Sequence, residues 1–163
     1  MRPALALPAV IVAFAPLGAQ GLPGQYQLVS APDLDAGISQ VMEGLPFFQK
    51  PLAQQRLHSV NPAYRRVTLD RGGEAVTIQF DGRRPLQVPL KGGITWTRED
   101  GEAFWVTAES HGNLVRQTYH AKDGERTNEF ELTPHGDLVL RVTVRSHKLP
   151  SVLKYQMVYR RSV

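Results

Sequence analysis

The chain has 163 residues, a formal net charge of +4 at pH 7 and no cysteine. The missing cysteine excludes disulfides, thiolate metal sites, a cysteine nucleophile and a lipid-modified N-terminal cysteine. The modest positive charge alternates with apolar residues along the C-terminal third instead of clustering beside aromatic residues. That distribution argues against a nucleic-acid-binding protein.

The N-terminus has the pattern of a secretory signal peptide. Arg2 is the only charged residue before Asp33, an apolar run follows it, and Ala19 offers a small residue for cleavage. The run is short and interrupted by prolines, which disfavours a membrane span, although a membrane anchor or a disordered tail is the alternative. We expect residues 1–19 to direct export, periplasmic or secreted, and residues 20–163 to form one domain.

A first strand over residues 24–30 is followed by the signals for a helix. Pro32 and Asp33 are suited to a first helical turn, Pro by its fixed φ and Asp by its charge. The apolar residues after them recur at helical spacing and form one stripe. That stripe consists of Leu34, Ile38, Val41, Met42 and Leu45.

A second, shorter helix is expected from Pro51, with Leu52 and Leu57 on its apolar side, and it ends before Asn61. The two helices together would form a helix-turn-helix inserted between the first and second strands. Such a pair could simply plug one end of a barrel, or it could act as a lid over an opening.

From Arg65 onward the apolar period changes to two, which is typical of half-buried strands. Nine further strands are expected near residues 65–70, 74–80, 84–90, 93–98, 103–109, 113–121, 126–133, 137–146 and 153–161. Most of the breaks between them contain glycine, and Asp81-Gly82, Asp100-Gly101 and Asp123-Gly124 are strong hairpin signals. The breaks leave no room for crossover helices, so the sheet is predicted to be an antiparallel meander.

A sheet with one apolar face and no covering helix layer buries that face by closing on itself. We therefore predict an all-β fold, an antiparallel up-and-down β-barrel of about ten strands with a short helix-turn-helix lid after strand 1. A sandwich or a half-open sheet is the alternative. An outer-membrane barrel, and with it stable membrane insertion, is disfavoured because most strands are short and the inserted helices have no place in such a barrel.

Several stretches resemble the calycin superfamily, and within it the fatty-acid-binding-protein-like barrels more than the lipocalins. The first strand, Gly24-Gln25-Tyr26-Gln27-Leu28-Val29-Ser30, is similar to the family's opening Gly-x-Trp-x-Leu-Val pattern, with Tyr in place of Trp. Residues 112–117, 131–132, 136–139 and 157–161 are similar to its closing strands. The resemblance implies the barrel fold with a helical lid and a hydrophobic small molecule as ligand.

Two departures from the family pattern concern the ligand's charge. The family holds a fatty-acid carboxylate with an arginine in an Arg-x-Tyr triplet on the last strand, where this chain has Met157-Val158-Tyr159. A second family arginine precedes Glu-Leu, and Phe130 stands there. Because apolar side chains replace both arginines, we expect an uncharged hydrophobic ligand.

Ten strands enclose more space than eight, so the strand count predicts an internal cavity. The expected ligand-binding residues are Trp96, Phe104, Phe130, Tyr155, Met157 and Tyr159, and the expected lid residues are Leu34, Ile38 and Met42. The two phenols would donate hydrogen bonds inside an otherwise apolar pocket.

The alternative is that these aromatics fill the core and the chain is a non-enzymatic interaction module with a protein partner. A filled interior with an exposed apolar patch would favour it.

No catalytic motif is present: the chain has no Gly-x-Ser-x-Gly elbow, P-loop or dinucleotide fingerprint. Its five histidines are scattered without metal-ligand spacing, and only His147, by its position before the last strand, suggests a haem ligand. We therefore expect no metal, no cofactor and no catalytic residues. A small hydrolase or isomerase acting inside the cavity is the weakest alternative.

Overall fold

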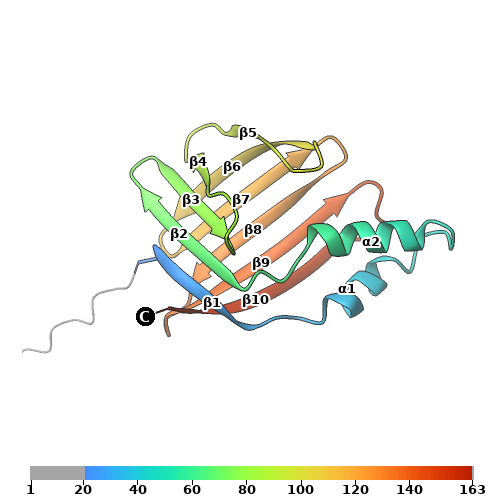
Figure 1. Ribbon diagram of the computed structural model, residues 1–163, viewed down its shortest axis with the longest axis horizontal. Helices are drawn as coiled ribbons and strands as arrows, with labels where there is room; N and C mark the ends of the chain where they lie inside the picture. The colour runs from blue at the N-terminus through green and yellow to red at the C-terminus, as the bar shows by residue number, and fades with distance from the viewer. Residues whose placement is uncertain (1–20, 163) are drawn as a thin grey trace, which may run out of the picture.

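The computed structural model describes residues 21–162, and it contains ten antiparallel strands and two short helices (Figure 1). In chain order the elements are β1 (Gly24–Ser30), α1 (Leu34–Val41), α2 (Lys50–Val60), β2 (Arg66–Gly72), β3 (Ala75–Phe80), β4 (Leu86–Pro89), β5 (Ile94–Thr97), β6 (Ala103–His111), β7 (Leu114–Ala121), β8 (Gly124–Leu132), β9 (Asp137–Ser146) and β10 (Leu153–Arg161). The predicted strand number and the helix pair after strand 1 are confirmed. No helix within the described residues is both long and apolar enough to cross a bilayer.

The sheet is a meander that closes between its first and last strands. The strand order is β4-β3-β2-β1-β10-β9-β8-β7-β6-β5. Every neighbouring pair in this order is hydrogen-bonded, whereas β4 and β5 are not bonded to each other. β4 and β5 are the two free edges. The gap between them is narrowed because β4 also lies against β6, with Val88 of β4 and Val106 of β6 both fully buried. The barrel is therefore nearly closed.

The alternation of side chains places apolar residues inside and charges outside. On the inner face Phe130 of β8, Leu140 of β9 and Met157 of β10 stand opposite one another in one row. On the outer face Arg116 of β7 pairs with Glu129 of β8 at 2.7 Å. Arg116 of β7 and Arg141 and Arg145 of β9 thus belong to a solvated outer face with interspersed carboxylates.

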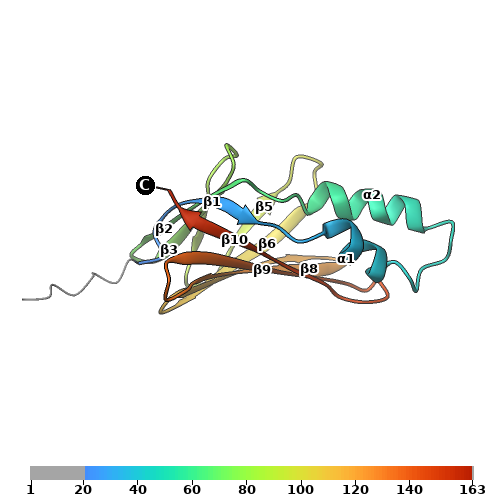
Figure 2. The ribbon, with the colours of Figure 1, turned by 90° about the horizontal axis from the view of Figure 1, so that it is seen from below.

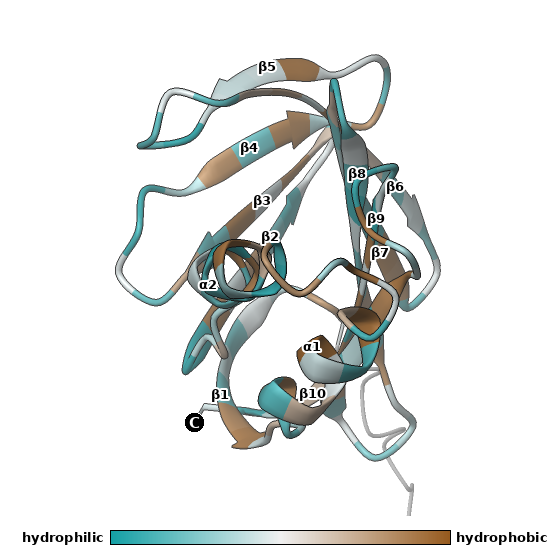
Figure 3. Cartoon of the chain, turned by 90° about the vertical axis from the view of Figure 1, so that its right-hand side faces the viewer, coloured by the Kyte–Doolittle hydropathy of each residue, from teal (hydrophilic) through white to brown (hydrophobic). Residues whose placement is uncertain are grey.

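The helix pair covers one end of the barrel, as Figures 2 and 3 show from two directions. The Asp33 carboxylate caps α1 by accepting a hydrogen bond from the backbone N–H of Ala36 at 3.1 Å. Apolar residues of both helices pack with Leu153 at the start of β10. Their cluster contains Ile38, Val41, Met42, Leu57 and Leu153, with Leu45, Ala53 and Tyr155 packed against it.

The expectation that Leu52 lies on the buried side of α2 is wrong, because its side chain is 73% exposed. Leu52 and Leu57 are five residues apart, which corresponds to about 140° around a helix of 3.6 residues per turn. Ala53, four residues before Leu57, is half-buried and packs against the cluster instead. Leu52 therefore lies on the outer side of the helix pair.

Candidate ligand-binding end of the barrel

The end of the barrel around Phe130, Met157 and Tyr159 is filled with side chains. All three are 0% exposed, and they belong to one core that joins opposite walls, from β2 and β3 to β8 and β10. A side chain that bordered a water-sized void would retain accessible surface, so none borders these residues. The internal cavity expected from the strand count is therefore absent around these three predicted ligand-binding residues.

The other predicted residues lie toward the helices, where the inner face is only half-buried. Trp96 of β5 and Phe104 of β6 lie with their ring centroids 5.7 Å apart. Tyr119 of β7, which the sequence analysis did not single out, joins them at 5.6 Å from Trp96 and 6.1 Å from Phe104. The three rings make a partly accessible aromatic wall on the inside of β5, β6 and β7.

A charged side chain continues this wall on the next strand. Arg126 of β8 stands directly opposite Tyr119, and its guanidinium donates to the backbone carbonyl of Val60 at 2.8 Å and to Asn61 Oδ1 at 2.9 Å. Its Nη2 lies 3.4 Å from the Tyr155 hydroxyl, which itself donates to Asn61 Oδ1 at 3.3 Å. An interior arginine thus connects β8, β10 and the end of α2.

Two buried side-chain amides, those of Asn128 and Gln117, continue the polar contacts of Arg126 toward the filled region around Phe130. Asn128 accepts from Arg126 Nε at 3.0 Å and donates to Gln117 Oε1 at 3.3 Å. Gln117 is 0% exposed, and its Nε2 has no hydrogen-bond partner in the structure. A buried donor without a partner is costly, so this row leaves hydrogen-bonding capacity unused inside the barrel.

We call Asn61, Trp96, Phe104, Tyr119, Arg126 and Tyr155 the helix-side cluster. It unites three predicted site residues with three that the sequence analysis missed. Of the predicted lid residues, Ile38 and Met42 are buried in the apolar cluster that the two helices form with Leu153. Leu34 is half-buried and does not belong to that apolar cluster. The chemistry of the helix-side cluster is that of a binding site with an apolar wall and a cationic, hydroxyl-bearing end.

The helix pair also contacts the connection between β5 and β6, through an ion pair of α2. Glu102, beside the β5–β6 turn, accepts from Arg56 of α2 at 3.2 Å and from Arg98 at 2.5 Å. Asp100 also accepts from Arg98, and this lowers the pKa of the Asp100 carboxyl to about 2. The exposed pair between Arg56 and Glu102 is worth little in free energy.

Burial raises the pKa values of Tyr119, Tyr155 and Tyr159 above the usual 10, and the nearby Arg126 opposes the shift only in part. Since the folded pKa is the higher one, the stabilising contribution is complete below pH 10 and is lost as the pH rises above it. Below pH 10 the free energy of unfolding should stay nearly constant with respect to these groups, and above pH 10 it should fall by at most about 1.4 kcal/mol per pH unit for each of them. Urea unfolding between pH 8 and 11 measures this slope.

The matched variant for that measurement is Tyr159→Phe. It should have a shallower pH dependence than the wild-type chain, whatever its stability at pH 8, because one buried ionisable group is gone. Equal slopes for the two proteins would show that Tyr159 ionises as easily in the fold as in the unfolded chain.

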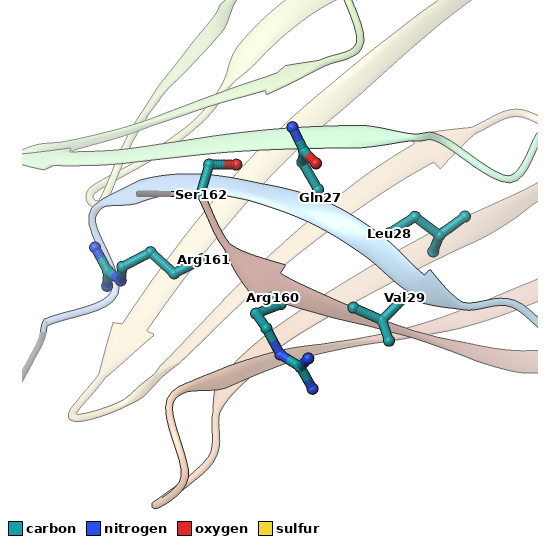
Figure 4. A pocket seen from close by; sticks show the side chains of 6 residues that line it. All are labelled: Gln27, Leu28, Val29, Arg160, Arg161 and Ser162. Carbon is teal, nitrogen blue, oxygen red and sulfur yellow. The ribbon is translucent and has the colours of Figure 1, made fainter.

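Two shallow, open hollows lie on the outside of the described residues. One, of about 420 Å³, follows the β1–β10 seam where the pairing shifts beside Val29 (Figure 4). The two Nη atoms of Arg161 donate to the carbonyls of Gly21 and Pro23 and to the Tyr26 hydroxyl, and its Nε has no hydrogen-bond partner in the structure. This seam therefore serves barrel closure.

The second outer hollow, of about 490 Å³, lies beside the loop between β9 and β10 and contains His147. His147 is exposed there, and its Nε2 lies 3.6 Å from a carboxylate oxygen of Asp123. No group of three or more potential metal ligands occurs within residues 21–162.

Solved structures with a similar fold are known. No family model and no curated protein matches the chain. Among solved structures, the REP1-NXSQ fatty acid transporter matches with a TM-score of 0.57 and 15% identity, covering 87% of this chain and 96% of the other. A tyrosine-to-phenylalanine mutant of the same transporter matches with a TM-score of 0.57 and 14% identity, covering 86% and 98%.

A third match is the fatty acid-binding protein of Drosophila melanogaster brain tissue. It has a TM-score of 0.55 and 15% identity, and it covers 86% of this chain and 99% of that one. At this identity the likeness shows the fold alone: the chain shares the β-barrel fold of these proteins, as its resemblance predicted.

Proposed function

We propose that this chain binds a hydrophobic small molecule at the helix-capped end of its barrel. The observation that carries the proposal is the helix-side cluster, in which partly accessible inner aromatics lie beside an arginine and a tyrosine hydroxyl. Inner aromatic side chains that retain accessible surface lose it when an apolar ligand covers them, which is favourable by about 25 cal/mol per Å². The names of the structural neighbours support a lipid-like ligand.

The ligand's body would lie along Trp96, Phe104 and Tyr119, beneath α2. The packed region around Phe130 and Met157 would form the floor of the site instead of its lining. The expectation of an uncharged ligand rests on the apolar side chains of these two residues alone, and it takes no account of the charge on Arg126. It stays a prediction that binding of paired acidic and neutral ligands can test.

Native mass spectrometry of the purified protein, combined with solvent extraction, tests the proposal. The full chain is expressed, purified without detergent, and weighed under native and denaturing conditions. We expect a co-purifying small molecule in stoichiometric amount that is released on denaturation. A ligand-free mass, together with no thermal shift across a panel of lipids, retinoids and haem, would contradict the proposal.

We further propose that the protein is exported, because residues 1–19 have the composition of a signal peptide. These residues lie outside the described part of the chain. The denatured mass supplies the test: loss of the mass of residues 1–19 is expected when the chain is expressed in a bacterial host. A full-length mass in the soluble cytoplasmic fraction would contradict export.

A second function, a protein-interaction module, is favoured by one specific feature. Phe47, Phe48 and Leu52, in and after the connection between α1 and α2, are 89%, 77% and 73% exposed. Exposed apolar clusters commonly mark interaction sites. The filled end of the barrel agrees with this alternative as well. A ligand-free mass in the experiment above would make it the leading function.

A further inference from the structure

Arg126 is unlike the arginines of the outer face because it carries its charge into the barrel. The outer arginines of β7 and β9 are paired with carboxylates, such as Arg145 with Glu125 at 3.0 Å. Within the described residues, no carboxylate lies within salt-bridge distance of Arg126. Its partners are two side-chain amides, a backbone carbonyl and a tyrosine hydroxyl.

The charge on Arg126 cannot be relieved by loss of a proton, because guanidinium stays protonated in proteins. Neutral acceptors satisfy its hydrogen bonds but leave the charge uncompensated in a half-buried site. An anion brought by a ligand would compensate it, and charge-assisted hydrogen bonds to a carboxylate are roughly twice as strong as neutral ones.

The arrangement also leaves one edge of the guanidinium available. Of its five N–H groups, Nε is taken by Asn128 and both Nη1 hydrogens by Val60 and Asn61. Nη2 has only the long 3.4 Å contact with Tyr155, so one of its hydrogens is unused and the other is weakly bound. The unused edge therefore lies beside the Tyr155 hydroxyl, whose single hydrogen can turn from Asn61 Oδ1 to a ligand oxygen.

We infer that Arg126 and Tyr155 receive the anionic head group of an amphiphilic ligand at the helix-capped end. The inference rests on the proposed function and adds the ligand class and its orientation. The head group would lie below the end of α2, and the tail would extend along the aromatic wall toward Trp96. The places of the family's arginines, at Phe130 and Met157, are then packing positions in this chain.

The test compares two ligands that differ only in the head group, dodecanoic acid and dodecan-1-ol, at pH 8. Each competes with Nile red, an uncharged fluorescent probe, for the wild-type protein, Arg126→Gln and Arg145→Gln. Glutamine keeps an amide donor for Val60 and removes the charge. Arg145→Gln is the matched control, because it removes an outward arginine two strands from the aromatic wall.

We expect the wild type and Arg145→Gln to bind the acid about ten- to hundredfold more tightly than the alcohol. In Arg126→Gln the acid should lose that advantage, while the alcohol stays within about threefold of its wild-type affinity. Arg126→Lys, which keeps the charge, should retain a preference for the acid. If Arg126→Gln does not fold, Arg126→Lys provides the second variant at this position.

Equal affinities of acid and alcohol for the wild type would overturn the inference and leave the proposed function standing. So would an unchanged preference for the acid in Arg126→Gln. If neither ligand nor Nile red binds the wild type, the proposed function itself fails.

Discussion

Replacing Phe130 by alanine is expected to destabilise the protein by about 3–5 kcal/mol. Phe130 is fully buried, lies 6.1 Å from the Phe80 ring on the facing wall, and is paired with Leu140, which in turn is paired with Met157. Because both walls are packed against it, the structure cannot relax enough to fill the space that the ring leaves. Chemical denaturation of the variant and the wild type measures the difference.

The control is Phe47→Ala, which removes the same side chain from an exposed position. Phe47 is largely in contact with solvent, so its loss should change stability by no more than about 0.5 kcal/mol. If Phe130→Ala were equally mild, Phe130 would border a void, and the barrel would be hollow where the structure shows it packed.

Met157→Arg is expected to be as damaging, and it should not create an acid-binding site. The substitution restores the family's Arg-x-Tyr triplet in sequence, but Met157 is 0% exposed and lies in the hydrophobic core beside Leu140. An unpaired buried charge costs about 3–5 kcal/mol. Thermal or chemical unfolding of the purified variant measures this loss.

The matched control is Gln156→Arg, one residue earlier on the outer face, where the added charge remains in solvent and stability should be nearly unchanged. A folded Met157→Arg protein that gains affinity for dodecanoic acid would show that the interior has room for the new side chain. It would also move the head-group site from Arg126 to the last strand.

The strands could be predicted from sequence because their signals are local. Period-two alternation and glycine-containing turns act within a few residues, and they placed every strand near its observed range. The pairing of β1 with β10 joins the two ends of the chain, so it was inferred from the apolar face and from the family resemblance. The shift in that pairing beside Val29 had no sequence signal.

The packing of the barrel could not be predicted from the number of strands. Strand number sets the circumference, but the space inside also depends on whether opposite walls approach each other. Here Phe80 of β3 lies 6.1 Å from Phe130 of β8, and apolar residues from both walls meet in one core. Phe130, Met157 and Tyr159, three residues expected to line a cavity, are fully buried in that core.

Arg126 could have been found from the sequence. It has the same parity as Phe130 on β8, as does Asn128, so the alternation that placed Phe130 inside places both of them inside too. An inward arginine in an apolar barrel is the signal of a polar subsite. Its contact with Val60, 66 residues earlier, depends on how the helix pair seats on the barrel and has no local signal.

The fluorescence of Trp96 tests most directly whether ligand binds in the helix-side cluster. The chain has two tryptophans, and Trp105 is half exposed on the outer face, so Trp105→Phe leaves Trp96 as the only indole. We predict that dodecanoic acid shifts the Trp96 emission to shorter wavelength and that the change saturates. An emission spectrum that stays constant to the solubility limit of the acid would contradict binding at this end of the barrel.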